Sequence, residues 1–191
     1  MYDQTFSESF SPIETPHLIL RRIQPDDWED LAEFLTDPKV VHFEPYFPFK
    51  REDCAQEAIN LSQNDSFFAI YLKRESKVIG KLYFHNEGQY GTYELGYTLN
   101  AAYQGQGYAK EASAALIRNA FESGTVRRII AYADEANTRS WNLLEHLGFV
   151  REGELHEYTY KYLDEDGQPR WQNMLIYAML QKTFLKETAP E

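Results

Sequence analysis

The pattern of hydrophobic and polar positions predicts short helices and strands that follow one another along the chain. Four stretches carry apolar residues at helical spacing, and seven are rich in β-branched and aromatic residues in short runs. We expect helices at residues 26–35, 50–62, 108–121 and 137–147, and strands at residues 17–23, 67–72, 78–84, 93–99, 128–133, 150–162 and 170–181.

The order of these elements predicts the fold class. Strands 67–72, 78–84 and 93–99 follow one another through polar turns, which predicts an antiparallel run. A helix then separates strand 93–99 from strand 128–133, and such a crossover unit makes these two strands parallel. We therefore expect an α+β fold, with a central mixed, mostly antiparallel, twisted sheet of about seven strands and about four helices.

The strongest local sign of a binding site lies between residues 93 and 121. A strand ends at Leu99, a turn with Gly105 and Gly107 follows, and a helix begins at Tyr108. No Ser, Thr, Asp or Asn caps this helix, so its first backbone N–H groups are open to a phosphate or pyrophosphate. On this pattern alone, an ordinary strand-to-helix turn explains the glycines equally well.

A nicotinamide or flavin site matches the same turn poorly. A dinucleotide fingerprint needs a third glycine, and an acidic residue about 20 positions later. Lys110 stands at the position of the third glycine, and Arg127 and Arg128 stand where the acidic residue belongs. We therefore do not expect a dinucleotide cofactor.

Composition narrows the class of protein. The chain has 191 residues, a formal net charge of −11, 43% hydrophobic residues and one cysteine, Cys54. We expect a single domain over residues 1–191, with its core at about 15–182 and an N-terminal arm and C-terminal tail outside it. The negative charge argues against a nucleic-acid partner. It favours cationic substrates, such as amines or basic peptides, although solubility alone explains it as well.

The sequence also lacks the signals of membrane and metal association. The N-terminus has no signal-peptide pattern, and no apolar run approaches the roughly 20 residues of a membrane span. His42, His85 and His156 form no metal-binding pattern. We expect a cytoplasmic protein with no metal and no membrane partner, and the long C-terminal strands are compatible with a homodimer.

Two motifs resemble the GNAT superfamily of N-acetyltransferases. Residues 104–109, QGQGYA, fit Q/R-x-x-G-x-G/A, the acetyl-coenzyme-A signature of that family. Asn137, Ser140 and then residues 147–149, LGF, resemble a later family motif. The resemblance implies an acyl-CoA N-acyltransferase fold with acetyl-CoA as co-substrate.

The start of the chain resembles one branch of that superfamily, the RimJ/RimL-like ribosomal-protein N-acetyltransferases. Residues 15–21, TPHLILR, followed by Asp26 and Asp27, look like the opening of that branch, and residues 94–97, ELGY, also fit it. The resemblance covers about residues 15–182.

The family motifs imply where coenzyme A binds. Backbone N–H groups of the glycine turn would hold the pyrophosphate, and the strand before it would hold the pantetheine arm. Arg127, Arg128 and Arg139 are candidates for the 3′-phosphate, and each is equally well a surface charge. The candidate cofactor-binding residues are Tyr97, Thr98, Leu99, Gln104, Gly105, Gln106, Gly107, Tyr108, Ala109, Lys110, Asn137 and Ser140.

The implied reaction is direct acyl transfer from a thioester to an amine, which must first lose a proton. At pH 7 this costs about 4–5 kcal/mol for a lysine amine but only about 1 kcal/mol for a peptide α-amine. The candidate general bases are Glu94 and Glu157. Each is otherwise a structural or exposed carboxylate.

One departure from the family affects the proton donor to the leaving thiolate. Many members carry a Tyr seven residues after the motif Asn, and here that position is Leu144. Ser140 is therefore the candidate acid. Water, or no donor at all, is the alternative, because a thiol is a good leaving group.

Residues 42–49, HFEPYFPF, contain two prolines and four aromatic residues and cannot form a regular central element. In the family, this region lines the amine side of the site. We expect a substrate wall here, and a loop that only closes the core is an equal alternative.

The leading hypothesis is an N-acetyltransferase that acts on a protein N-terminus or a small-molecule amine. A non-catalytic acyl-CoA-binding sensor with the same fold is the alternative, favoured only by the missing tyrosine. A scaffold protein is a third hypothesis, based on the aromatic surface segments.

Overall fold

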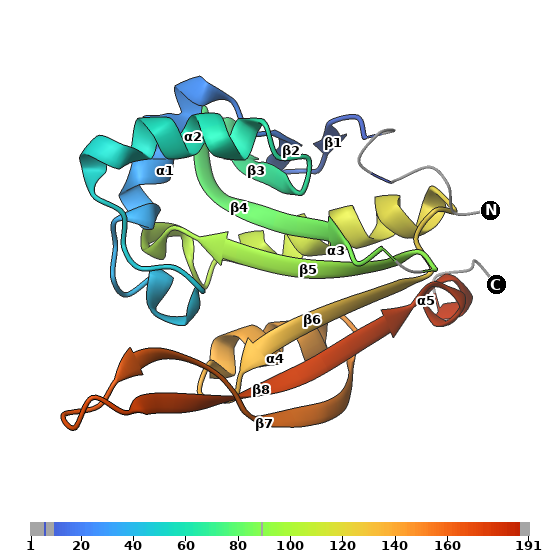
Figure 1. Ribbon diagram of the computed structural model, residues 1–191. Coiled ribbons are helices and arrows are strands. Elements are labelled where there is room, and N and C mark those ends of the chain that lie inside the picture. Colours follow the sequence, from blue (N-terminus) through green and yellow to red (C-terminus); the bar gives the residue numbers. More distant parts are fainter. Residues whose placement is uncertain (1–5, 7–9, 89, 188–191) are drawn as a thin grey trace.

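A single eight-stranded sheet forms the centre of the computed structural model, which describes residue 6, residues 10–88 and residues 90–187. The strand order is β1-β2-β3-β4-β5-β6-β8-β7 (Figure 1). The strands are β1 (Ile13–Glu14), β2 (Leu18–Arg22), β3 (Phe67–Leu72), β4 (Lys77–Asn86), β5 (Thr92–Leu99), β6 (Arg128–Asp134), β7 (Val150–Leu163) and β8 (Pro169–Leu180). The helices are α1 (Trp28–Leu35), α2 (Cys54–Ser62), α3 (Tyr108–Glu122), α4 (Thr138–His146) and α5 (Gln181–Glu187).

The predicted fold class, an α+β fold with a mostly antiparallel sheet, is confirmed. β5 and β6 form the parallel pair that the crossover unit predicted. The described residues contain eight strands and five α-helices, instead of about seven and about four. The two additional elements are β1, which has only two residues, and α5, which occupies part of the expected tail. β1 is too short to leave a pattern in the sequence.

Helices cover both faces of the sheet (Figure 1). α1 and α2 lie on one face, where Leu31, Phe34 and Ala58 form a core with Val78 of β4. α3 and α4 lie on the other face, where the apolar stripe of α3 packs on the strands. The stripe therefore orients α3, and this fixes the direction of its N-terminus.

The prediction that the N-terminal arm lies outside the core is wrong for its aromatic residues. Phe6 is 1% exposed, and Phe10 packs against the same core. The Phe6 N–H donates to the Tyr93 hydroxyl at 2.9 Å, and the Phe6 ring packs edge-on against Phe84. At the other end of the chain, Phe184 of α5 packs against the core that α3 forms with the sheet. Both ends therefore add to the domain.

No helix in the described part of the chain is long and apolar enough to cross a membrane.

Candidate active site

The sheet opens between β5 and β6. These strands pair only from Thr92 to Glu94 on β5, opposite Arg128 to Ile130 on β6. Beyond this point they diverge (Figure 1), while β6 continues to pair with β8 as far as Asp134. The second half of β5 therefore has one edge without a neighbouring strand.

The hydrogen-bond pattern of β5 shows which backbone groups face the gap. The Asn100 N–H donates to the Ile79 carbonyl at 2.9 Å. Because alternate residues of an antiparallel pair bond to the same neighbour, Thr98 directs its backbone groups to β4. Tyr97 and Leu99 direct theirs into the gap. Of the three β5 residues named from the sequence, Thr98 is thus the one whose backbone N–H and C=O groups do not face the gap.

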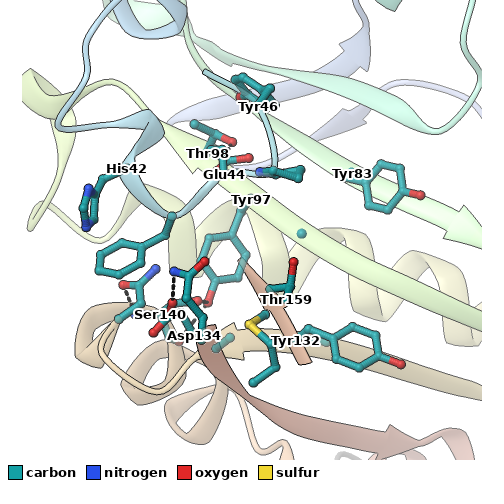
Figure 2. A pocket seen from close by; sticks show the side chains of 18 of the residues that line it. His42, Glu44, Tyr46, Tyr83, Tyr97, Thr98, Tyr132, Asp134, Ser140 and Thr159 are labelled. Atoms are coloured by element: carbon teal, nitrogen blue, oxygen red, sulfur yellow. Dashed lines mark hydrogen bonds between the residues drawn. The ribbon is translucent and has the colours of Figure 1, made fainter. Parts of the chain in front are cut away.

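A cavity of about 980 Å³ occupies the gap. Side chains from β5, β6, the loop at residues 42–47 and the β7–β8 hairpin converge on it (Figure 2). Glu94, Tyr97, Thr98, Asn137 and Ser140 are among its lining residues. The structure therefore brings together candidates that are more than 40 residues apart in the sequence.

The glycine turn leads from β5 to α3 and presents unpaired backbone donors. Gly105 and Gly107 have positive φ angles of 75° and 88°, which favour glycine. Within the described residues, no hydrogen-bond acceptor contacts the backbone N–H groups of residues 105–110. The Gln104 side chain donates to the Leu99 carbonyl at 2.9 Å, which fixes the turn to the end of β5.

Asn137 and Ser140 lie at the N-terminus of α4. The Asn137 side chain accepts a hydrogen bond from the Ser140 N–H at 3.3 Å, so it caps the helix while it lines the cavity. The Tyr97 hydroxyl donates to the Ser140 carbonyl at 2.8 Å and lies 3.0 Å from Ser140 Oγ. Burial raises the pKa of Tyr97 to about 12, although its bond to Ser140 opposes the shift. Leu144 is buried and lines the same cavity.

The two candidate bases differ in their surroundings. Glu94 is half-buried in the cavity wall, where β5 and β6 separate. Burial, and secondly the neighbouring Glu87 carboxylate, raise the pKa of Glu94 to about 7. Glu157 is exposed at a bulge of β7, with φ 48°, and its N–H donates to Asn173. Glu157 is not among the lining residues of the cavity.

The loop at residues 42–47 forms a wall of the cavity, as expected. The hairpin of β7 and β8 holds this loop in place. Lys161 donates to the carbonyls of Val41 and His42, at 2.6 and 3.3 Å, and the His42 ring stacks on Tyr162. This side of the cavity is therefore built from two segments distant in the sequence.

A family model described as "Acetyltransferase (GNAT) domain" matches residues 17–150, which is more than half of the chain. The chain belongs to the GNAT acetyltransferase family. It is therefore an acetyl-CoA-dependent N-acetyltransferase, and the non-catalytic alternative is not favoured.

Curated and solved relatives agree with this. The chain is 30% identical to the uncharacterized N-acetyltransferase YnaD of Bacillus subtilis, over 90% of this chain and 98% of that protein. It is 29% identical to the ribosomal protein uS5-alanine N-acetyltransferase of Escherichia coli, over 87% of this chain and 89% of that protein. A solved GNAT-family acetyltransferase from Bacillus anthracis matches with a TM-score of 0.78 and 29% identity, over 90% of this chain and 99% of that chain.

The three arginines suggested for the 3′-phosphate of the GNAT co-substrate all contact protein groups. Arg128 forms an ion pair with Glu152, and Arg127 donates to the Tyr90 carbonyl. Arg139 donates to the Gln104 side chain at 3.1 Å, and so joins α4 to the glycine turn. Arg139 is thus the candidate that lies at the turn.

Sequence reasoning missed several polar residues of this GNAT cavity. Lys81 and Tyr83 of β4 line it, as do Asp134 of β6 and Gln172 of β8. The signal for Lys81 was present, because a charged residue interrupts the otherwise apolar run VIGKLYF. The signal for Asp134 and Gln172 was absent, because their proximity depends on the pairing of β6 with β8.

Proposed function

We propose that this protein acetylates α-amines, in the manner of the RimJ/RimL-like branch, with Glu94 as the general base. The observation that supports this most strongly is the position of Glu94. It lies in the cavity wall where β5 and β6 separate, and its pKa is raised to about 7. A general base works best with a pKa near the operating pH.

The pKa of Glu94 matches an α-amine better than a lysine amine. An α-ammonium has a pKa of about 7.7, so transfer of its proton to Glu94 costs about 1 kcal/mol. A lysine ammonium has a pKa of about 10.4, and the same transfer costs about 4–5 kcal/mol. The difference favours α-amines of a protein N-terminus or of a small molecule. The Escherichia coli relative named for ribosomal protein uS5-alanine is consistent with this class.

The gap and the glycine turn fit the co-substrate. The unpaired N–H groups of residues 105–110, at the start of α3, suit a pyrophosphate. The open edge of β5, at the Tyr97 backbone and the Leu99 N–H, suits an extended arm that hydrogen-bonds to the backbone. The Asn137 side-chain amide faces the same cavity.

The residues of the site supply both proton transfers. Glu94 takes the proton that the amine loses, and the C–N bond forms as the C–S bond breaks. Ser140 Oγ gives a proton to the departing thiolate. The Tyr97 hydroxyl, 3.0 Å from Oγ, replaces that proton when its O–H turns from the Ser140 carbonyl to Oγ, and Tyr97 then regains a proton from water. The Tyr97 hydroxyl therefore supplies a proton donor in a cavity where Leu144 offers none.

A coupled assay of CoA release with matched amines tests this function. We expect turnover with peptides whose only amine is at the N-terminus, and at least about 10-fold lower kcat/KM when the only amine is a lysine side chain. Acetyl-CoA should also raise the Tm by mass action. Binding of acetyl-CoA with no turnover of any amine would instead support a non-catalytic acyl-CoA-binding module.

A further inference from the structure

A buried lysine lies in the acceptor side of the cavity. Lys81 of β4 is 5% exposed and lines the cavity. Its ammonium lies between two aromatic rings, 5.1 Å from the centroid of Tyr46 and 5.0 Å from that of Phe67. The ring faces attract a cation, but they offer no oxygen or nitrogen acceptor for its three N–H groups.

Lys81 Nζ has no hydrogen-bond or ion-pair partner within the part of the chain that the structure describes. No acceptor lies within hydrogen-bond distance of it, and no carboxylate lies within 4.0 Å. Burial lowers the pKa of Lys81, and the more distant Glu44 and Glu57 oppose this shift. A buried ammonium without a paired acceptor is costly, so this position calls for an anion.

Other charged groups of the cavity are already bonded. Thr98 donates to Glu44 at 2.8 Å. Asp134 accepts from Gln172 at 2.5 Å and from a backbone N–H at 2.7 Å. Lys161 donates to two backbone carbonyls. Lys81 is therefore the lysine of this cavity that remains free to bind a ligand.

A second buried donor lies beside Lys81. The Tyr46 hydroxyl is buried and makes no hydrogen bond of ordinary geometry, although Thr98 and Glu44 are near it. Burial raises the pKa of Tyr46, so the hydroxyl keeps its proton at neutral pH. In the described part of the chain, the ammonium of a buried lysine and a buried hydroxyl thus make no hydrogen bond of ordinary geometry, and together they match the two oxygens of a carboxylate.

The sheet register places Lys81 and Glu94 on paired strands, and Lys81, Tyr46 and Glu94 line the same cavity. Lys81 pairs with Thr98, four residues along β5 from Glu94, which is about 13 Å of strand. Phe67 pairs with Tyr83, so an ammonium at the Phe67 ring leans from Lys81 toward the Glu94 end. Gly96 lies between Glu94 and Thr98 on β5 and pairs with Tyr83. Because glycine has no side chain, nothing projects into the cavity from this position.

We infer that Lys81, with Tyr46, binds a carboxylate of the acceptor, so that the acceptor carries both an α-amine and a carboxylate. The acceptor is then a free amino acid or the N-terminus of a peptide with an acidic side chain. This inference rests on the proposed function, because it takes the amine to lie at Glu94. It disfavours polyamines, although the net charge of the whole chain slightly favours cationic acceptors.

The test compares each acceptor with its neutral amide, in the wild type and in Lys81→Met. One arm uses free amino acids against amino-acid amides. The other uses peptides that begin with Asp or Glu against peptides that begin with Asn or Gln. In one of the two arms we expect the wild type to prefer the carboxylate about 10- to 100-fold in kcat/KM. Lys81→Met should remove that preference, because the substitution should lower kcat/KM for the carboxylate acceptor much more than for its amide. Lys81→Arg should retain part of the preference.

Two further measurements keep the result interpretable. The Tm and the acetyl-CoA affinity of Lys81→Met should stay close to wild type, because methionine fills a similar buried volume. Equal use of carboxylate and amide by the wild type in both arms would overturn the inference, and so would an equal loss of both in Lys81→Met.

If the wild type acetylates no amine at all, the proposed function fails. Direct binding measurements then test whether Lys81 binds a carboxylate. Calorimetry with N-acetyl amino acids and with N-acetylated Asp or Glu peptides should then show binding to the wild type and at least 10-fold weaker binding to Lys81→Met. No binding, or equal binding to both proteins, would overturn the inference.

Discussion

At the residue scale, Glu94 shows how position changes the chemistry of a common side chain. A glutamate near pKa 4.3 is a weak base, whereas Glu94, half-buried and beside Glu87, has a pKa of about 7. The base must be deprotonated to act, so kcat/KM should rise as pH rises through about 7. Glu94→Gln should lower kcat/KM by about 10²- to 10⁴-fold. It should also leave only the rise near about 7.7 that comes from deprotonation of the α-amine substrate.

Two variants serve as controls for that pH profile. Glu87→Gln removes the neighbouring negative charge, so the rise should move to lower pH while activity is retained. Glu157→Gln alters an exposed carboxylate on β7 and should leave the profile in place. If Glu94→Gln keeps the wild-type profile, the base lies elsewhere, at Glu157 or in a chain of water molecules.

Ser140 and Tyr97 give a second prediction at this scale. Ser140→Ala removes the hydroxyl nearest to the Tyr97 hydroxyl and should lower kcat about 10-fold or more, with acetyl-CoA binding close to normal. Tyr97→Phe should lower kcat in the same direction. Pre-steady-state kinetics of CoA release would measure both. An unchanged kcat in Ser140→Ala would remove Ser140 from the mechanism.

The sequence predicted these residues unevenly. Glu94, Asn137 and Ser140 lie in motifs with fixed spacing, so a resemblance could locate them. Tyr97 was expected only to hold the co-substrate, and its contact with Ser140 spans 43 positions of sequence. Such a contact depends on the packing of α4 beside β5, which no local pattern encodes.

At the element scale, the turn before α3 allows a matched test of the co-substrate site. Gly107→Ala places a side chain at φ 88°, which costs about 1–2 kcal/mol, and should distort the unpaired N–H groups. We expect lower stability and a KM for acetyl-CoA raised at least several-fold. Gly124→Ala, at φ 75° beyond the other end of the same helix, should cost similar stability without changing that KM. Equal KM values in both variants would contradict the assignment.

The sequence predicted most elements because hydrophobic periodicity is local. The opening between β5 and β6 was not predicted from the sequence, because the opening depends on where pairing stops, at Glu94 and Ile130. The bulge at Glu157 was missed for a related reason, since a register shift between Leu155 and Thr159 is a property of two strands.

At the scale of the whole molecule, the N-terminal arm belongs to the core. Phe6→Ala should lower the free energy of unfolding by about 3–5 kcal/mol, because it removes a ring that is 1% exposed and packed on Phe84. Urea denaturation would measure the change. Phe47→Ala, at a ring that is 59% exposed, is the control and should change stability by less than about 1 kcal/mol. Equal small effects would place Phe6 outside the core.

The central claim is that the cavity between β5 and β6 acetylates α-amines with Glu94 as base. The most direct measurement is tandem mass spectrometry of a peptide that carries one α-amine and one lysine, after incubation with acetyl-CoA. The account predicts that the acetyl group is found on the α-amine, with the wild type and not with Glu94→Gln. Acetylation confined to the lysine, or equal α-amine acetylation by both proteins, would contradict it.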